Sequence, residues 1–87
     1  MLEVTMYTTS TCPYCRAAKK LLNAKGIRYT EIDVQSAPVR NEMVSRSGRR
    51  TVPQIFFGNH HVGGFDDLAQ LESEGGIDEA LSPRLAG

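Results

Sequence analysis

The stretch Thr11-Cys12-Pro13-Tyr14-Cys15-Arg16 decides the fold that we predict for this chain. It holds the only two cysteines among 87 residues, with two positions between them. Apolar and β-branched residues typical of a strand come before it, and apolar residues at helical spacing follow it. A Cys-x-x-Cys pair between a strand and a helix indicates a redox-active dithiol.

The spacing of the two cysteines lets both sulfur atoms meet across the first turn of a helix. Pro13 suits the first helical position, because the N–H that proline lacks has no intrahelical acceptor there. Cys12 then lies at the helix N-terminus, where unpaired N–H groups and the helix dipole favour a thiolate. Cys15 lies one turn further, on the side of Ala18 and Leu22, so we expect it to be more buried.

A thiolate at this position needs more than the helix dipole, which contributes at most about 2 kcal/mol. We therefore expect hydrogen bonds to the Cys12 sulfur from the N–H groups of Tyr14 and Cys15. Arg16 and Lys19 are candidate cations near the sulfur. The alternative for both is an ordinary solvated charge on the helix surface.

The composition predicts one small domain spanning residues 1–87, near the size at which a single core is only just sufficient. Ten basic residues balance ten acidic ones, so no strong field attracts nucleic acid. No run of about 18 apolar residues occurs, and Met1-Leu2-Glu3 begins no signal peptide. We therefore expect a cytoplasmic protein without membrane contact, a setting in which lasting structural disulfides are rare.

Strands and helices alternate along the predicted fold. The expected strands are 2–7, 27–34, 54–57 and 60–62, and the expected helices are 13–25, 36–47, 65–73 and 77–81. Strand, helix and strand joined by one crossover imply a parallel pair, and the Gly58-Asn59 turn adds a hairpin to the same sheet. We expect an α/β fold of order β-α-β-α-β-β-α, a four-stranded mixed sheet flanked by helices, with a loosely held end at 82–87.

Four motifs follow one another in the chain at specific spacings. They are Tyr7-Thr8, Thr11-Cys12-Pro13-Tyr14-Cys15, Thr51-Val52-Pro53-Gln54-Ile55-Phe56 and Gly63-Gly64-Phe65-Asp66-Asp67. With them the chain resembles, over nearly its whole length, the dithiol glutaredoxins within the thioredoxin fold. Its short length and the Ser47-Gly48-Arg49 stretch resemble the bacterial glutaredoxin 3 type.

The resemblance implies a groove for glutathione, a tripeptide with two carboxylates and one ammonium whose thiol must reach Cys12. Family residues matching Thr51 and Val52 bind its cysteinyl backbone in the manner of an added strand. Pro53 resembles the family's cis-proline, with a trans proline opening a strand as the alternative. The implied glutathione-binding residues are Tyr14, Thr51, Val52, Pro53, Gly64, Phe65 and Asp66.

The Gly63-Gly64 pair permits close backbone approach at this groove. By resemblance, the N–H groups of Phe65 and Asp66 at a helix N-terminus meet the γ-glutamyl carboxylate. A carboxylate from Asp66 or Asp67 can pair with the ammonium, and plain helix capping is the alternative for each.

At three positions near the expected thiolate and the groove, the sequence leaves open whether a cation contacts the thiolate or the ligand. Many relatives have a lysine where this chain has Thr9, so a cation is missing there unless an arginine substitutes. Arg49 or Arg50 can attract the glycyl carboxylate, and a solvated loop charge is the equal alternative.

The resemblance implies a glutathione-dependent thiol–disulfide oxidoreductase that carries electrons in cell redox homeostasis. Cys12 attacks a protein–glutathione mixed disulfide or a protein disulfide, Cys15 resolves the intermediate, and glutathione restores the reduced enzyme. Glutathione is then reductant and co-substrate, and no metal is expected. The expected partners of this monomer are glutathionylated or disulfide-containing cytosolic proteins, with ribonucleotide reductase a candidate at the family level.

Other functions fit the cysteine pair less well. A thioredoxin-like donor recycled by a flavoprotein reductase would not need the Gly63-Gly64-Phe65-Asp66 turn. An iron–sulfur carrier would share a cluster between two chains through Cys12 and glutathione, but relatives of that kind usually lack Pro13. A zinc site would have only two thiol ligands, because His60 and His61 adjoin on a strand and point to opposite faces as ordinary hairpin residues.

Overall fold

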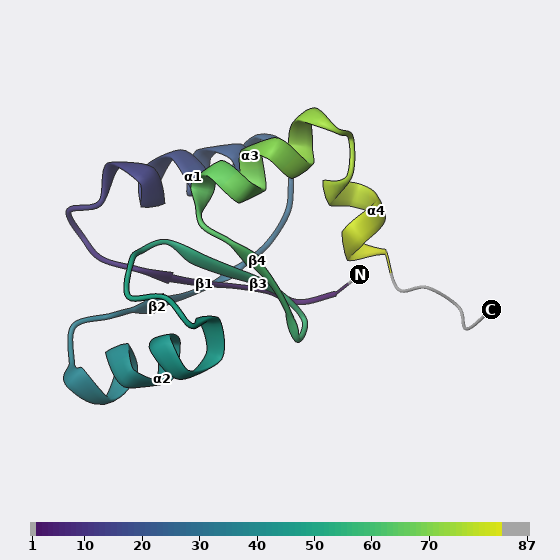
Figure 1. The fold of residues 1–87 in the computed structure, drawn as a ribbon. Coiled ribbons are helices and arrows are strands. Elements are labelled where there is room, and N and C mark those ends of the chain that lie inside the picture. Colours follow the sequence, from purple (N-terminus) through teal and green to yellow (C-terminus); the bar gives the residue numbers. More distant parts are fainter. Residues whose placement is uncertain (1, 83–87) are drawn as a thin grey trace.

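The computed structural model describes residues 2–82, in which one four-stranded sheet is covered by helices on both faces. The elements are β1 (Val4–Thr8), α1 (Pro13–Ala24), β2 (Thr30–Asp33), α2 (Ala37–Ser47), β3 (Gln54–Phe57), β4 (His60–Gly63), α3 (Phe65–Ser73) and α4 (Ile77–Leu81). Helices α1 and α3 lie over one face of the sheet and α2 lies over the other (Figure 1). The predicted loose end at 82–87 lies, apart from Ser82, outside the described residues.

The sheet has the strand order β2-β1-β3-β4 and is mixed, as predicted. Strand β1 pairs in parallel with β2, whereas the β1–β3 and β3–β4 pairs are antiparallel. The predicted parallel pair and hairpin are therefore confirmed. Helices α3 and α4 also have the predicted bounds.

Two predicted strands were too long at their N-terminal ends. The strand expected at 27–34 is only Thr30–Asp33, because Gly26 and Ile27 form the cap that follows α1. Gly26 there has a φ of +70°, its N–H donates to the Asn23 carbonyl, and the Ile27 N–H donates to the Leu22 carbonyl at 2.9 Å. This pair of bonds is a Schellman motif.

The first strand is displaced in the same way. Leu2 donates its N–H to the Leu81 carbonyl at 2.7 Å, at the end of α4, so pairing in β1 begins only at Val4.

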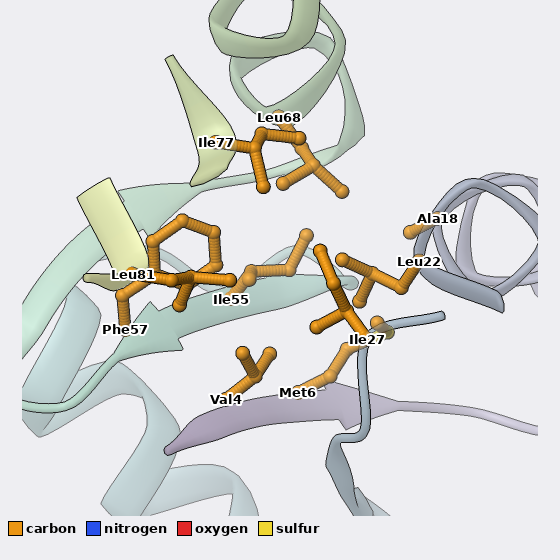
Figure 2. Packing of buried hydrophobic residues seen from close by; sticks show 10 residues of the cluster. All are labelled: Val4, Met6, Ala18, Leu22, Ile27, Ile55, Phe57, Leu68, Ile77 and Leu81. Atoms are coloured by element: carbon orange, nitrogen blue, oxygen red, sulfur yellow. The ribbon is translucent and has the colours of Figure 1, made fainter. Parts of the chain in front are cut away.

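The larger core lies between the sheet and helices α1, α3 and α4 (Figure 2). Its buried members are Val4, Met6, Ala18, Leu22, Ile27, Ile55, Phe57, Leu68, Ile77 and Leu81. A smaller cluster on the α2 face consists of Tyr7, Val34, Met43 and Phe56. Strands β1 and β3 alternate between the two clusters, as the period of two in a strand requires, and both strands are buried on both faces.

Three loops meet at one end of the sheet because of this strand pairing. Tyr7 near the end of β1 pairs with Gln54 at the start of β3, and Ile55 pairs with Gly63 at the end of β4. The loop that presents Cys12, the loop before β3 and the turn into α3 therefore lie at the same edge.

Candidate active site

Cys12 is the N-cap residue of α1 and is half-buried. Its Sγ accepts a hydrogen bond from the Cys15 N–H at 3.1 Å, and its thiol donates to the Val52 carbonyl oxygen at 3.6 Å. Pro13 occupies the first turn of α1, as predicted. Of the two N–H donors predicted for this sulfur, Cys15 supplies the bond found within residues 2–82.

Cys15 is fully buried on the side of α1 that carries Ala18 and Leu22, as predicted. Burial raises the pKa of the Cys15 thiol to about 12, and its hydrogen bond with Cys12 adds to the rise. Both cysteines are free thiols in this structure. Cys15 is therefore protonated at neutral pH, whereas Cys12 is the thiol that a substrate can reach.

The candidate cation Lys19 is engaged elsewhere. Its Nζ lies 2.8 Å from Oε2 of Glu31, and the same oxygen accepts a hydrogen bond from Thr8 Oγ1 at 2.7 Å. The Lys19 hydrogen bond, followed by that of Thr8, lowers the pKa of Glu31, so the pair stays ionised. Lys19 thus joins α1 to β2, and the alternative of a surface helix charge describes it better.

A groove of about 260 Å³ lies beside the Cys12 sulfur. It is lined by Tyr14, Arg49, Thr51, Val52, Pro53, Gly64, Phe65, Asp66 and Asp67. All seven residues predicted to bind glutathione are among them. Arg49 is there as well, whereas Arg50, the other candidate arginine, is not among the lining residues.

The two walls of the groove come from distant parts of the chain. One wall carries the Val52–Pro53 peptide bond, which is cis, as the family resemblance implies for Pro53. On the other wall, a Cβ on Gly64 would lie 3.5 Å from the Pro53 carbonyl oxygen, so the two backbones are close. Phe65 stacks on the ring of Tyr14, with centroids 6.4 Å apart and an interplanar angle of 27°.

Asp67 closes the start of α3. Its Oδ2 accepts a hydrogen bond from the Gly64 N–H at 2.9 Å and lies 3.1 Å from Nη1 of Arg49. The Gly64 bond and then the Arg49 bond hold the pKa of Asp67 below its usual range. Gly63, with a φ of +123°, is required because a Cβ there would clash with this carboxylate. Capping, the alternative considered for Asp67, is therefore its role in the described structure.

Two polar residues behind the groove wall, Gln54 and His61, were not predicted from the sequence. Gln54 is fully buried, and its Nε2 donates to the carbonyl oxygen and the hydroxyl of Thr51 at 3.0 and 3.1 Å. Its Oε1 lies 2.7 Å from Nε2 of His61. A glutamine in an otherwise apolar strand was the available signal, because a buried amide needs partners.

Among residues 2–82, no cluster of three or more His, Cys, Asp or Glu side chains is placed to hold a metal ion. The helices in this part of the chain are too short to span a membrane.

Comparison with known proteins gives consistent matches. Residues 4–62 match the sequence model of the glutaredoxin family. Glutaredoxin 3 of Escherichia coli K12 is 50% identical over 82 residues, which are 93% of this chain and 99% of that protein. The predicted likeness to the bacterial glutaredoxin 3 type is thus confirmed at the level of sequence.

Solved structures agree with this comparison. The solution structure of a glutaredoxin from Brucella melitensis has a TM-score of 0.85 and 50% identity, covering 99% of this chain and 96% of that one. The crystal structure of a buckwheat glutaredoxin–glutathione complex has a TM-score of 0.84 and 28% identity, with coverage of 92% and 76%. The predicted thioredoxin-like fold is confirmed.

Proposed function

This chain belongs to the glutaredoxin family, and on that premise we propose that it is a glutathione-dependent thiol–disulfide oxidoreductase. The family makes it a thiol–disulfide oxidoreductase with a pair of redox-active cysteines. The dependence on glutathione, the roles of individual residues and the substrates are our proposal.

One observation carries the proposal: the groove wall reaches the sulfur of Cys12. The Val52 carbonyl oxygen is 3.6 Å from Cys12 Sγ, so a cysteinyl residue pairing with the Thr51–Val52 backbone has its own sulfur within reach. Main-chain pairing of this kind is the way that an extended peptide adds to a sheet edge. The buckwheat glutaredoxin that was solved with glutathione supports this choice of ligand.

The charges along the groove suit the two ends of glutathione. The N–H groups at the start of α3, at Phe65 and Asp66, favour the γ-glutamyl carboxylate, because a helix N-terminus binds anions. We assign the carboxylate of Asp66, an exposed residue that lines the groove, to the ammonium. Arg49 is placed for the glycyl carboxylate, although in the present structure it is paired with Asp67.

The reaction begins with the Cys12 thiolate. It attacks the glutathione sulfur of a mixed disulfide, the old S–S bond breaks, and the protein substrate leaves as a thiolate. A second glutathione thiolate then attacks Cys12-bound glutathione and departs with it as glutathione disulfide. With a protein disulfide, Cys12 attacks one substrate sulfur, the substrate S–S bond breaks, and the other substrate sulfur leaves as a thiolate. Cys15 then gives up its proton to that thiolate or to water and attacks the Cys12 sulfur, which breaks the mixed disulfide, forms the Cys12–Cys15 disulfide and releases the reduced substrate. Two glutathione molecules reduce this disulfide and leave as glutathione disulfide.

The proposed substrates are glutathionylated or disulfide-containing proteins of the cytoplasm, which the chain meets as a monomer. Ribonucleotide reductase is one candidate from the family.

A coupled assay tests this function. A glutathionylated peptide is supplied with glutathione, glutathione reductase and NADPH, and the oxidation of NADPH is followed. We expect turnover that depends on glutathione and falls at least about a thousandfold in Cys12→Ser, because the nucleophile is lost. Turnover that proceeds with a flavoprotein thioredoxin reductase and ignores glutathione would contradict the proposal.

A further inference from the structure

A buried chain of polar side chains leads from the α2 face of the sheet to the groove wall. Gln54 donates from Nε2 to both oxygens of Thr51, at 3.0 and 3.1 Å, and meets His61 at 2.7 Å through Oε1. Every polar atom of the Gln54 side chain therefore has a partner, although the residue has no exposed surface. A buried amide that is fully satisfied holds its partners in a defined geometry.

The direction of these bonds follows from elementary donor and acceptor rules. The Thr51 carbonyl oxygen can only accept, so the atom of Gln54 that faces it is the NH₂ group. The Gln54 atom facing His61 is then the carbonyl oxygen, which can only accept. Nε2 of His61 must therefore carry a proton, and the bond runs from His61 to Gln54 to Thr51.

His61 is itself held in place by the strand pairing. In the β3–β4 ladder Phe56 pairs with His61 and Ile55 pairs with Gly63, so Val62 is the extra residue of a β-bulge. The His61 ring lies on the ring of Phe56 with centroids 4.9 Å apart. His60, the neighbour in sequence, is exposed and lines a shallow hollow next to α3 on the other face.

The consequence at the groove comes from the planarity of the peptide bond. In a trans peptide the carbonyl of one residue and the N–H of the next point in opposite directions. Because Gln54 binds the Thr51 carbonyl on the buried side, the Val52 N–H is turned away from that side. This N–H belongs to the wall that meets the ligand. The buried side-chain amide of Gln54 therefore determines whether the Val52 N–H points toward the ligand.

We propose that His61 is a positioning residue, which acts through Gln54 to keep the Thr51–Val52 peptide in the orientation that binds the cysteinyl backbone of the ligand. The inference rests on the function proposed above for the groove. It assigns His61 a part in substrate binding although its ring lies outside the groove.

Three variants test whether His61 positions the Thr51–Val52 peptide through its hydrogen bond or only stabilises the fold by packing. His61→Phe keeps the aromatic contact with Phe56 and removes the donor, whereas His61→Gln retains an N–H at a similar reach. Gln54→Glu keeps the acceptor for His61 but removes the donor to Thr51, and His61 can neutralise the added charge. His60→Phe is the matched control, because it makes the same exchange at the neighbouring exposed position.

The test is steady-state kinetics with a glutathionylated peptide, after thermal unfolding has verified that each variant is folded. We expect His61→Phe and Gln54→Glu to raise KM about five- to tenfold with kcat within about twofold, the change expected for one hydrogen bond. His61→Gln should restore most of the loss, and His60→Phe should have no effect. An unchanged KM in both His61→Phe and Gln54→Glu, or an equal rise in His60→Phe, would overturn the proposal.

A second readout does not involve glutathione. Long-range nitrogen–proton NMR spectra of the neutral His61 ring should show the proton on Nε2, and His61→Phe should speed solvent exchange of the Gln54 side-chain amide. A proton on Nδ1 would overturn the proposal. If the wild-type protein shows no glutathione-dependent turnover, the proposed function fails, and these spectra still decide whether the bonding chain exists.

Discussion

Cys12 and Cys15 lie one turn apart on α1 in opposite surroundings. Cys12 is the half-buried N-cap, accepts an N–H bond at 3.1 Å and lies against the groove wall. Cys15 has no exposed surface, and burial raises the pKa of its thiol to about 12. Position on the helix, rather than residue type, therefore distinguishes the two thiols, and it underlies the roles that we propose, nucleophile for Cys12 and resolving thiol for Cys15.

The same helix creates both environments. Its apolar side, with Ala18 and Leu22, is buried in the larger core and takes Cys15 with it. Its N-terminus lies at the edge of the sheet where three loops meet, so Cys12 stays accessible. A substitution that changes the surroundings of one cysteine alone should therefore change the properties of that thiol and leave the other thiol as it is.

The largest expected effect comes from removing the buried thiol. Cys15→Ser should keep deglutathionylation within a few-fold of wild type, because a second glutathione can release Cys12. Reduction of a protein disulfide should fall at least about a hundredfold, since intramolecular attack has a very high effective concentration. The assay compares both substrates, and intact mass should show a Cys12–glutathione adduct.

Cys12→Ser is the control for this experiment and should lose both activities. If deglutathionylation in Cys15→Ser collapses to the level of Cys12→Ser, then Cys15 does more than resolve the intermediate.

The burial of Cys15 should also make stability depend on pH. Its pKa rises from 9.0 to about 12 in the folded protein, so between these values the unfolded chain loses a proton that the folded chain keeps. The protonated Cys15 thiol therefore contributes its full share to the free energy of unfolding below about pH 9. Between about pH 9 and 12 that free energy falls by roughly 1.4 kcal/mol per pH unit.

Urea unfolding of the reduced protein at pH 8 and pH 10 measures this effect. Cys15→Ala lacks the titrating thiol and is the reference for this experiment. The free energy of unfolding of wild type should fall by about 1 kcal/mol relative to Cys15→Ala between the two pH values. Parallel curves for the two proteins would show that Cys15 is not buried as a neutral thiol.

The smallest expected effect is a faster reaction of Cys12, which should widen the difference in reactivity between the two thiols. Thr9→Lys adds a cation to the loop that precedes Cys12, in a half-buried position. We expect alkylation of Cys12 at pH 6 to become about two- to fourfold faster, and the gain to shrink in 1 M salt because the charge is screened. Thr9→Gln is the uncharged control. An equal rate in Thr9→Lys and wild type would mean that other groups already stabilise the thiolate.

The sequence predicted most of the fold because its turn-forming residues and the periodic spacing of its apolar residues are strong local signals. The parallel pair, the hairpin and both late helices follow from such local signals. The errors at the starts of β1 and β2 have different causes. Leu2 bonds to the end of α4, a tertiary contact that local propensity does not contain. Ile27 closes the Schellman motif of α1, a local cap that delays the start of β2.

The residues of the candidate site that belong to recognisable motifs could be predicted. The spacing of the two cysteines predicted the redox pair, and the family resemblance implied the seven groove residues, which the structure brings together beside Cys12. The partners of charged and polar side chains could not be predicted. Lys19 is bound by Glu31 from β2, Arg49 by Asp67, and His61 reaches Thr51 only through Gln54. The first two contacts join residues 12 and 18 positions apart in the chain, and the third depends on the register of the β3–β4 hairpin.

The different surroundings of the two cysteines can be measured most directly by competitive alkylation of the fully reduced wild-type protein at pH 6. Iodoacetamide is added for increasing times, and peptide mapping gives the modified fraction of each cysteine. Because only an ionised and accessible thiol reacts, Cys12 should be modified at least about a hundredfold faster than Cys15. Equal rates, or Cys15 labelled first, would contradict the assignment of Cys12 as nucleophile and Cys15 as buried resolving thiol.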